Sequence, residues 1–275
     1  MDPMETILEA GRADRNYWRD LWRYRELFQV LAWRDFAVRY RQTVVGVVWA
    51  VMRPLLTMVV LTVIFNKVAG LSSEGEAPYA LMVLAGMLPW MFFSTALADA
   101  SNSLIANNAL ISKIYFPRLI VPTATIIVSI VDFLIGLAIL GLMMIWYQYA
   151  PNWQILFLPF FGIMAFLAVL GPGLWVTAIN VRYRDFRYVI PFIVQFGLYV
   201  SPVGFAFSKV PEEWRLLYSL NPMVGVINGF RWSILGGDAP LYWPSVAISM
   251  VVIALMLWLG IRQFRKLEKS FADLI

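Results

Sequence analysis

The stretch LIVPTATIIVSIVDFLIGLAILGLMMIWY, from Leu119 to Tyr147, holds 29 residues and only one acidic or basic side chain, Asp132. A helix needs about 20 mostly apolar residues to cross the hydrocarbon core of a bilayer. This stretch is long enough and apolar enough to meet that need. It is therefore predicted to be a transmembrane helix.

Five further stretches of the chain meet the same requirement. They run from Val47 to Val68, from Pro78 to Ala98, from Ile155 to Ile179, from Val189 to Phe207 and from Leu241 to Ile261. Hydrophobic residues make up 61% of the 275 residues and charged residues 14%, whereas soluble domains are about half apolar and about a quarter charged. We therefore predict an all-α integral membrane protein with six transmembrane helices.

The distribution of Lys and Arg predicts how these helices are oriented. If both ends of the chain lie inside, the inner segments hold 17 of the 22 basic residues and the outer segments hold four. Cytoplasmic loops of membrane proteins carry such an excess. We expect a cytoplasmic segment at 1–43, a six-span transmembrane domain at 44–261 and a cytoplasmic tail at 262–275.

The segment before the first span, NYWRDLWRYRELFQVLAWRDFAVRYRQT (Asn16–Thr43), alternates aromatic and charged residues. Trp18, Trp22 and Phe28 recur near helical spacing, and Arg23 lies between them. This pattern predicts an amphipathic helix that lies in the membrane interface. A small helix packed on a partner protein is an alternative, and the two are compatible. No cleavable signal peptide is expected, because no small-residue cleavage site follows a short apolar run.

Between the fifth and sixth spans, the chain contains two apolar pieces that are each too short to cross a membrane. They are Trp214–Leu220 and Met223–Leu235, separated by Asn221 and Pro222 and followed by two glycines. Short apolar segments of this kind often enter the membrane and return, and Asn-Pro favours a turn. We predict a re-entrant helix pair, with a pair of helices on the outer surface as the alternative.

Few charged residues lie within the predicted spans. Arg53 precedes Pro54 in the first span, Asp99 ends the second, and Asp132 lies in the third. Charged groups in a membrane are costly and are functional candidates by default. Arg53 has the alternative of reaching the nearby headgroups. For Asp132 we expect pairing with a positive charge, or hydrogen bonding as a neutral acid, rather than a proton relay.

Aromatic residues form 16% of the chain, and some fall in the middle of predicted spans. Trp90 and Phe93 are three residues apart, while Phe196 and Tyr199 continue a stripe that starts at Phe192. Aromatic faces can stack on sugar rings while allowing them to slide. Packing between helices is the competing interpretation.

The loop NNALISKIYFPR (Asn107–Arg118) is a short amphipathic segment between the second and third spans. An apolar helix face can dock into a groove on another protein. The loop is therefore a candidate contact for a cytoplasmic partner, with an interfacial helix that touches only lipid as the alternative. The residues that we assign to this contact are Asn107, Asn108, Leu110, Ile111, Lys113, Ile114, Tyr115 and Arg118.

The sequence offers little for catalysis or cofactor binding. It contains no His and no Cys, which removes the commonest metal ligand and the usual side chain for proton transfer near neutral pH. It also contains no Gly-Lys pair, so the phosphate-binding loop of nucleotide hydrolases is absent. We therefore expect no metal site, and any ATP that drives this protein must bind to another chain.

Four segments together resemble the membrane subunit of type-2 ABC exporters of polysaccharides, a group that exports O-antigen, capsule and teichoic acid. They are GVVWAVMRPLL (46–56), the loop at 107–118, RDFRYVIPFIVQFGLYVSPV (184–203) and NPMVGVINGFRWSILG (221–236). The segments occur in the family's order and at its spacing over nearly the whole chain. The resemblance implies a permease subunit in a bacterial inner membrane that moves lipid-linked polysaccharide, with O-antigen as the first candidate.

The resemblance also implies partners and roles. It implies a homodimer with two cytoplasmic ATPase subunits that bind ATP and Mg²⁺, while this chain holds no cofactor. Residues 107–118 would be the coupling helix, residues 16–43 the gate helix and Asn221-Pro222 the re-entrant turn. The channel would form between protomers from spans one, two and five, and its lining candidates are Trp49, Trp90, Phe93, Phe196 and Tyr199.

Three rival functions stay open at this point. A secondary transporter commonly has broken helices at matching places in two related halves, but here the break occurs in one half only. An intramembrane transferase needs positioned acids or bases, and Asp99 and Asp132 are the few carboxylates near the spans. The same architecture carrying a drug or a small lipid is the closest alternative.

Overall fold

The structure is a computed structural model that describes residues 17–40, 44–73, 75–183, 185–236, 240–269 and 271, with backbone alone at 44–47. Every regular element in these ranges is helical, so the all-α prediction is confirmed for them. Several predicted features lie outside the described residues: the chain before Tyr17, the junction at 41–43, the second glycine after Leu235, and residues 272–275.

The helices divide between two halves of the chain. The first half contains α1 (Tyr17–Arg23), α2 (Arg25–Tyr40), α3 (Val44–Thr62), the π-helical turn η1 (Val63–Val68), α4 (Tyr79–Ala106), α5 (Asn108–Ile111) and α6 (Ile120–Trp146). The second half contains the 3₁₀ turn η2 (Trp153–Phe157), α7 (Leu158–Arg182), α8 (Phe186–Val200), the 3₁₀ turn η3 (Phe207–Lys209), α9 (Glu212–Tyr218), α10 (Pro222–Leu235) and α11 (Trp243–Glu268).

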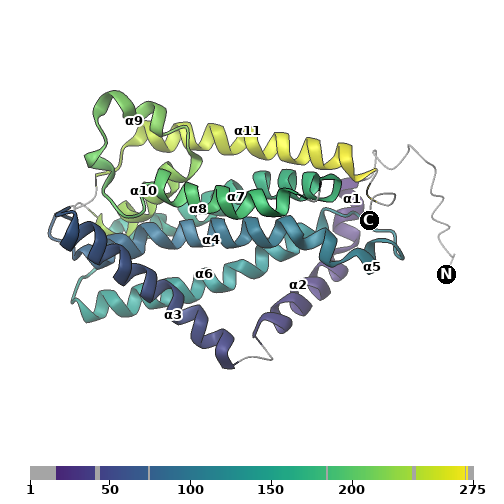
Figure 1. Cartoon of the computed structure of the whole chain (residues 1–275), viewed down its shortest axis with the longest axis horizontal. Coiled ribbons are helices and arrows are strands. Elements are labelled where there is room, and N and C mark those ends of the chain that lie inside the picture. The colour runs from purple at the N-terminus through teal and green to yellow at the C-terminus, as the bar shows by residue number, and fades with distance from the viewer. Residues whose placement is uncertain are drawn as a thin grey trace.

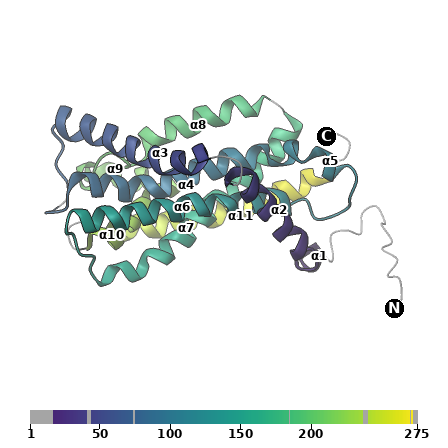
Figure 2. The same ribbon diagram turned by 90° about the horizontal axis from the view of Figure 1, so that it is seen from below.

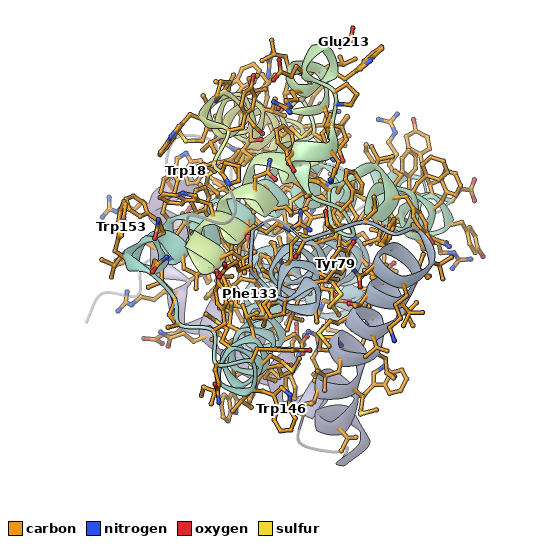
Figure 3. All side chains as sticks on the ribbon, turned by 90° about the vertical axis from the view of Figure 1, so that its left-hand side faces the viewer. Trp18, Tyr79, Phe133, Trp146, Trp153 and Glu213 are labelled. Atoms are coloured by element: carbon orange, nitrogen blue, oxygen red, sulfur yellow. The ribbon has the colours of Figure 1, made fainter. Side chains whose placement is uncertain are left out.

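The long helices form a bundle with two distinct ends (Figure 1). The helices α4, α6, α7, α8 and α11 run along the long axis. The short helices α1 and α5 lie at one end, called here the α5 end, and α9 and α10 lie toward the other, called the α9 end. Viewed from the α9 end, Tyr79 and Phe133 lie near the middle, while Trp146, Trp153 and Glu213 lie at the periphery (Figure 3).

Helix α4 is the centre of the bundle, and α3 and α8 are at its edge. Most of α4 is buried, including Leu81, Leu84 and Met87, and it packs against α6, α7, α10 and α3. By contrast, Ile190 is the buried residue of α8. Figure 2 shows α8 apart from the other long helices along much of its length. The two edge helices therefore leave apolar faces uncovered.

The number of long spans differs from the prediction. Six such helices were predicted. In the described residues, five are long and apolar enough to cross a membrane, namely 48–68, 79–106, 120–146, 153–182 and 243–268. The fifth predicted span, 189–207, is α8, which ends at Val200 and has 15 residues. Ser201 already has an extended backbone, because the following Pro202 disfavours a helical conformation in the residue before it and supplies no N–H.

The buried side chain of Arg231 supplies hydrogen-bond donors to the irregular chain that follows α8. Its Nη2 donates to the carbonyl of Val203 at 2.6 Å and its Nη1 to that of Phe205 at 2.7 Å. Its Nε donates to the carbonyl of Met82 in α4 at 3.1 Å. Arg231 is 1% exposed, and buried carbonyls without donors are costly. The guanidinium of Arg231, which belongs to α10, thus donates hydrogen bonds to carbonyls of the irregular chain after α8 and to a carbonyl of α4.

The two short helices before α11 have different surroundings. No residue of α9 is buried, whereas α10 is almost fully buried and packs against α11, α4, α7 and η2. Asn221 caps α10, since its Oδ1 accepts a bond from the Met223 N–H at 3.0 Å, and Pro222 takes the first helical position. Gly236 ends α10 with a φ of 64°, a conformation that favours glycine.

Two apolar cores hold the bundle together. The larger one centres on α4 and extends through α6, α7 and α10. The smaller one lies at the α5 end, where Leu31, Ile111, Phe116 and Phe264 join α2, the loop at 107–118 and α11. Helices α7 and α11 approach closely at Gly171 and Gly260. A Cβ on Gly260 would lie 2.1 Å from the Gly171 carbonyl oxygen, so there is no space for a side chain there.

Replacing Arg231 with Met tests its role in the fold. The variant keeps most of the side-chain volume but removes three hydrogen bonds, two of them to the irregular chain after α8, so we expect the free energy of unfolding to fall by about 3 kcal/mol. The measurement is the midpoint of thermal unfolding in detergent. The exposed residue Lys209 provides the control, Lys209→Met. Equal midpoints for the two variants would contradict the assignment.

Candidate functional site

A cluster of charged side chains joins α2 to α4 and α6. The Nη1 of Arg39 donates to Asp132 Oδ2 at 2.9 Å, and its Nη2 bonds to Asp99 Oδ2. The phenol of Tyr40 donates to Asp132 Oδ1. The side chains of Arg39, Asp99 and Asp132 are 29%, 32% and 33% exposed, so solvent screens these pairs only in part. The cluster holds the end of α2 against the bundle.

The cluster forms one wall of a cavity of about 310 Å³ between four helices. Besides the cluster, Trp49 and Arg53 of α3 and Phe92 of α4 line it. Phe133 of α6 lines the same cavity and lies near the middle of the bundle in the end-on view (Figure 3). Both charged residues that the sequence places within spans, Arg53 and Asp132, therefore meet in one cavity.

The lining of this cavity combines carboxylates, guanidinium groups and aromatic rings. Carboxylates accept hydrogen bonds from hydroxyl groups, guanidinium groups donate to hydroxyl and phosphate oxygens, and aromatic faces give contact area. Small-molecule sites commonly have this mixture of apolar walls and a few polar groups, in volumes of about 300–1,000 Å³. Within the part of the chain that the structure describes, this cavity is therefore our candidate ligand-binding site.

The amphipathic segment before the first span packs partly onto the bundle. Leu31 is buried and Phe28 is partly buried in the core at the α5 end, while Trp18 and Trp22 are 58% and 74% exposed. Arg23 is also exposed. The segment therefore has one face against the protein and a second, tryptophan-bearing face that remains uncovered.

The loop at 107–118 is called the coupling loop below, after the role that the family resemblance implies for it. It begins and ends in contacts with other helices. At its start, Arg34 Nη2 of α2 donates to Asn107 Oδ1 at 2.6 Å. At its end, the backbone N–H of Arg118 donates to Glu268 Oε1 at 2.8 Å, and Arg118 Nη1 donates to the Glu268 carbonyl at 2.6 Å. Burial, with the nearby charge of Glu268, raises the pKa of Tyr17 on α1 well above its ordinary value, so its phenol stays protonated.

The side chains of the coupling loop divide between the bundle and the surface. Asn107 and Ile111 are buried, and Leu110 and Arg118 are partly buried. Ile111, which the sequence offered to a partner, packs into the core of the protein itself, because α5 turns that face inward. The outward side chains are those of Asn108, Lys113, Ile114 and Tyr115. The last two are about half exposed and could enter a groove on another protein.

The aromatic residues proposed for the channel also separate into two groups. Trp49, Phe196 and Tyr199 are about 60% exposed, and Phe196 stacks on Phe192 with 5.4 Å between ring centroids. Trp90 is 6% exposed and lies under α8, where a Cβ on Gly197 would be 2.4 Å from its ring. Phe93 is partly buried, 5.4 Å from the Trp90 ring. The exposed group lies on the two edge helices.

Most of this chain, including the site, matches one protein family. Residues 26–235 match the family model described as the ABC-2 type transporter, from the start of α2 to the end of α10. The chain belongs to the ABC-2 transporter family. The matched range includes the charged cluster, the cavity, the coupling loop and the buried α10.

Curated relatives match this ABC-2 protein over most of their length. The O-antigen export system permease protein RfbA of Myxococcus xanthus is 25% identical over 94% of this chain and 98% of its own. The protein of the same name from Klebsiella pneumoniae is 24% identical over 91% and 95%. The polysialic acid transport protein KpsM of Escherichia coli is 22% identical over 88% and 93%.

Three contacts of this ABC-2 protein are not predicted by the sequence. Arg39 binds the two carboxylates of the cavity. Arg231 is buried, and Glu268 accepts a hydrogen bond from the backbone N–H of Arg118. The signal available for Arg39 was the pair of span carboxylates, which require a nearby cation.

The contribution of Arg39 can be tested by hydrogen–deuterium exchange. In Arg39→Gln, the carboxylates of Asp99 and Asp132 lose their shared cation, so α2 is expected to detach more often and peptides from 25–40 to exchange about tenfold faster. The exposed Arg25, at the other end of the same helix, gives the control Arg25→Gln. The interpretation fails if the two variants exchange alike.

Proposed function

We propose that this protein is the permease subunit of an ATP-driven exporter that moves lipid-linked polysaccharide, with O-antigen as the first candidate, across the bacterial inner membrane. The observation that carries the cargo class is the match to three polysaccharide-transport relatives over 88–94% of this chain. Polysialic acid transport by one of them favours capsule polysaccharide as the second candidate. The absence of a Gly-Lys pair supports placing the ATP and Mg²⁺ sites in a separate subunit.

In the proposed topology the α5 end faces the cytoplasm and the chain crosses the membrane six times. The excess of Lys and Arg supports this orientation. Five crossings correspond to the five long helices. The sixth combines α8, which is about 22 Å long at 1.5 Å per residue, with the irregular segment 201–206. Helix α10 then represents the re-entrant piece, supported by its burial among α4, α7 and α11.

The proposed conduit forms between two copies of the chain. Helices α3 and α8 present apolar and aromatic faces that their own protomer does not cover. A second copy would bury part of these faces, and the remainder, with Trp49, Phe196 and Tyr199, would line the path. Aromatic faces contact sugar rings without a fixed hydrogen-bond register, which suits a polymer that must slide. Trp90 supports the path from behind α8 by packing against Gly197.

The proposed cycle begins at the cavity between α2, α3, α4 and α6. The lipid-linked end of the polymer enters from the interface beside α2, where Arg53 offers a cation and the Arg39 cluster a polar wall. ATP binding in the partner moves the coupling loop, and the Arg34–Asn107 contact carries this motion to α2. The cluster at Arg39 then releases or closes the cavity.

Reconstitution tests the whole proposal. The chain, purified with its ATPase subunits and placed in liposomes with lipid-linked O-antigen, should make glycan accessible to an external glycosidase only when ATP is hydrolysed. A complex with a Walker A Lys→Ala substitution in the ATPase is the matched control. An intact, ATP-hydrolysing complex that moves no glycan would argue against the polysaccharide assignment.

The aromatic path predicts a selective loss of transport. In the double variant Phe196→Ala and Tyr199→Ala, two exposed rings of α8 are removed, and stacking on a sugar contributes about 1 kcal/mol per ring. We expect transport to fall about thirtyfold while ATP hydrolysis continues. Phe160→Ala removes an exposed ring from α7 instead and should leave transport near the wild-type rate. Equal losses would remove α8 from the path.

The coupling loop predicts a loss of assembly. Ile114→Asp places a charge on an exposed apolar side chain that is expected to enter the ATPase groove, so copurification of the ATPase should fall by about tenfold or more. Ile105→Asp, on an exposed position of α4 just before the loop, is the control. The ATPase copurifying equally with both variants would place the contact elsewhere.

A further inference from the structure

We propose that a groove between α1 and α11 binds an anionic phospholipid of the inner leaflet. The groove is about 730 Å³ and is separate from the cavity described above. Two tryptophans, Trp18 and Trp258, and four cations line it, namely Arg262, Arg265, Lys266 and Lys269. The proposal rests on the proposed membrane orientation but on neither the cargo nor the ATPase.

The four cations of the groove occupy one face of a single helix. Positions 258, 262, 265, 266 and 269 recur at three- and four-residue intervals, so their side chains point to the same side of α11. Trp18 comes from α1, about 240 residues earlier in the chain. The fold brings it there partly through Arg265, whose guanidinium lies 4.7 Å from the centre of the Tyr17 ring on α1.

The groove lies at the depth where a phospholipid changes from tail to headgroup. Helix α11 is apolar from Trp243 to Ile261, and those 19 residues rise about 28 Å, close to the hydrocarbon thickness. Arg262 is the first charge after this run, and Lys269 lies about 10 Å further on. Trp258 is thus at the tail side of the groove, where amphipathic rings accumulate, and the cations are at the phosphate side.

In the described residues, the groove lining holds four cations and no Asp or Glu. Arg265 and Lys269 also line a neighbouring pocket that contains Asp20 and Glu268. Glu268, the nearest acid along α11, binds the backbone and side chain of Arg118. Arg262 lies over the Trp258 ring at 5.1 Å from its centroid, which orients the guanidinium while leaving its N–H groups for an acceptor.

A phospholipid fits this arrangement better than the other anionic partners. Free phosphate would use the cations but not the two exposed tryptophans, which are 58% and 55% exposed. An acidic surface of the ATPase would not reach Trp258, which lies at tail depth. Membrane proteins in general carry basic residues at the inner leaflet. That general excess does not require four cations on one face of a helix, opposite a tryptophan from another helix. A basic groove beside a transmembrane helix is a known mode of anionic lipid recognition.

Native mass spectrometry of the intact complex with its ATPase subunits tests the proposal. The detergent-solubilised complex is titrated with phosphatidylglycerol, cardiolipin or phosphatidylcholine, without ATP or glycan. We expect the wild type to retain the two anionic lipids over phosphatidylcholine. The variant Arg262→Gln with Lys266→Gln should weaken anionic lipid binding about tenfold or more, because each cation near the surface contributes about a factor of five.

A matched control comes from the turn between α7 and α8 at the same end of the bundle. Arg182→Gln with Arg187→Gln removes the same charge from exposed positions, and there too each guanidinium lies over an aromatic ring. This variant should bind anionic lipid as the wild type does, and excess inorganic phosphate should not displace the lipid.

Four outcomes would overturn the proposal. Equal losses in both double variants would mean diffuse charge attraction, and no loss in either would mean that the groove is not a lipid site. Displacement by inorganic phosphate would indicate a phosphate site. Loss of the ATPase from Arg262→Gln with Lys266→Gln, with lipid retained, would assign the groove to that subunit. Because lipid binding is measured without transport, its failure leaves the proposed function untouched.

Discussion

Inside an apolar bundle, each backbone N–H and C=O must find its partner within the protein, and the architecture of this chain follows from that constraint. Most of the chain meets it by forming helices. The exception is the segment after Val200, where Pro202 ends α8 early. There the guanidinium of Arg231 takes the place of backbone donors for Val203 and Phe205, and it joins them to Met82 of α4. These bonds allow the bundle to contain a segment of irregular chain.

The cost of unpaired polar groups in an apolar bundle also explains the Arg39 cluster. A lone Asp132 within an apolar helix is costly, and a lone Asp99 nearby adds to the cost. Arg39 offsets both, but it comes from α2, which lies outside the predicted spans. The position of α2 is thereby coupled to the pairing of two carboxylates on other helices. A polar ligand in the adjoining cavity would compete for the same groups, which gives a direct physical link between the cavity and the position of α2.

The α5 end collects the contacts that a transport cycle would use. The coupling loop contacts Arg34 of α2 at one end and Glu268 of α11 at the other, so a movement of the loop would act on both helices. The chain belongs to the ABC-2 transporter family, and the matched residues include this loop. The lipid groove lies beside the same junction, on α1 and α11. A bound anionic lipid would therefore add a link between the first and last helices of the chain.

The all-α class, five of the long helices and the extent of α10 could be predicted without coordinates, because apolar run length and the Asn-Pro signal are local properties. The charged residues Arg53 and Asp132 and the exposed rings of α8 were located in the same way. Long-range packing was needed to bring Arg39 to Asp132 across 93 residues, to turn Ile111 and Trp90 inward and to bury Arg231. Helical periodicity defines the faces of a helix, but which face is covered depends on neighbours that are distant in the chain.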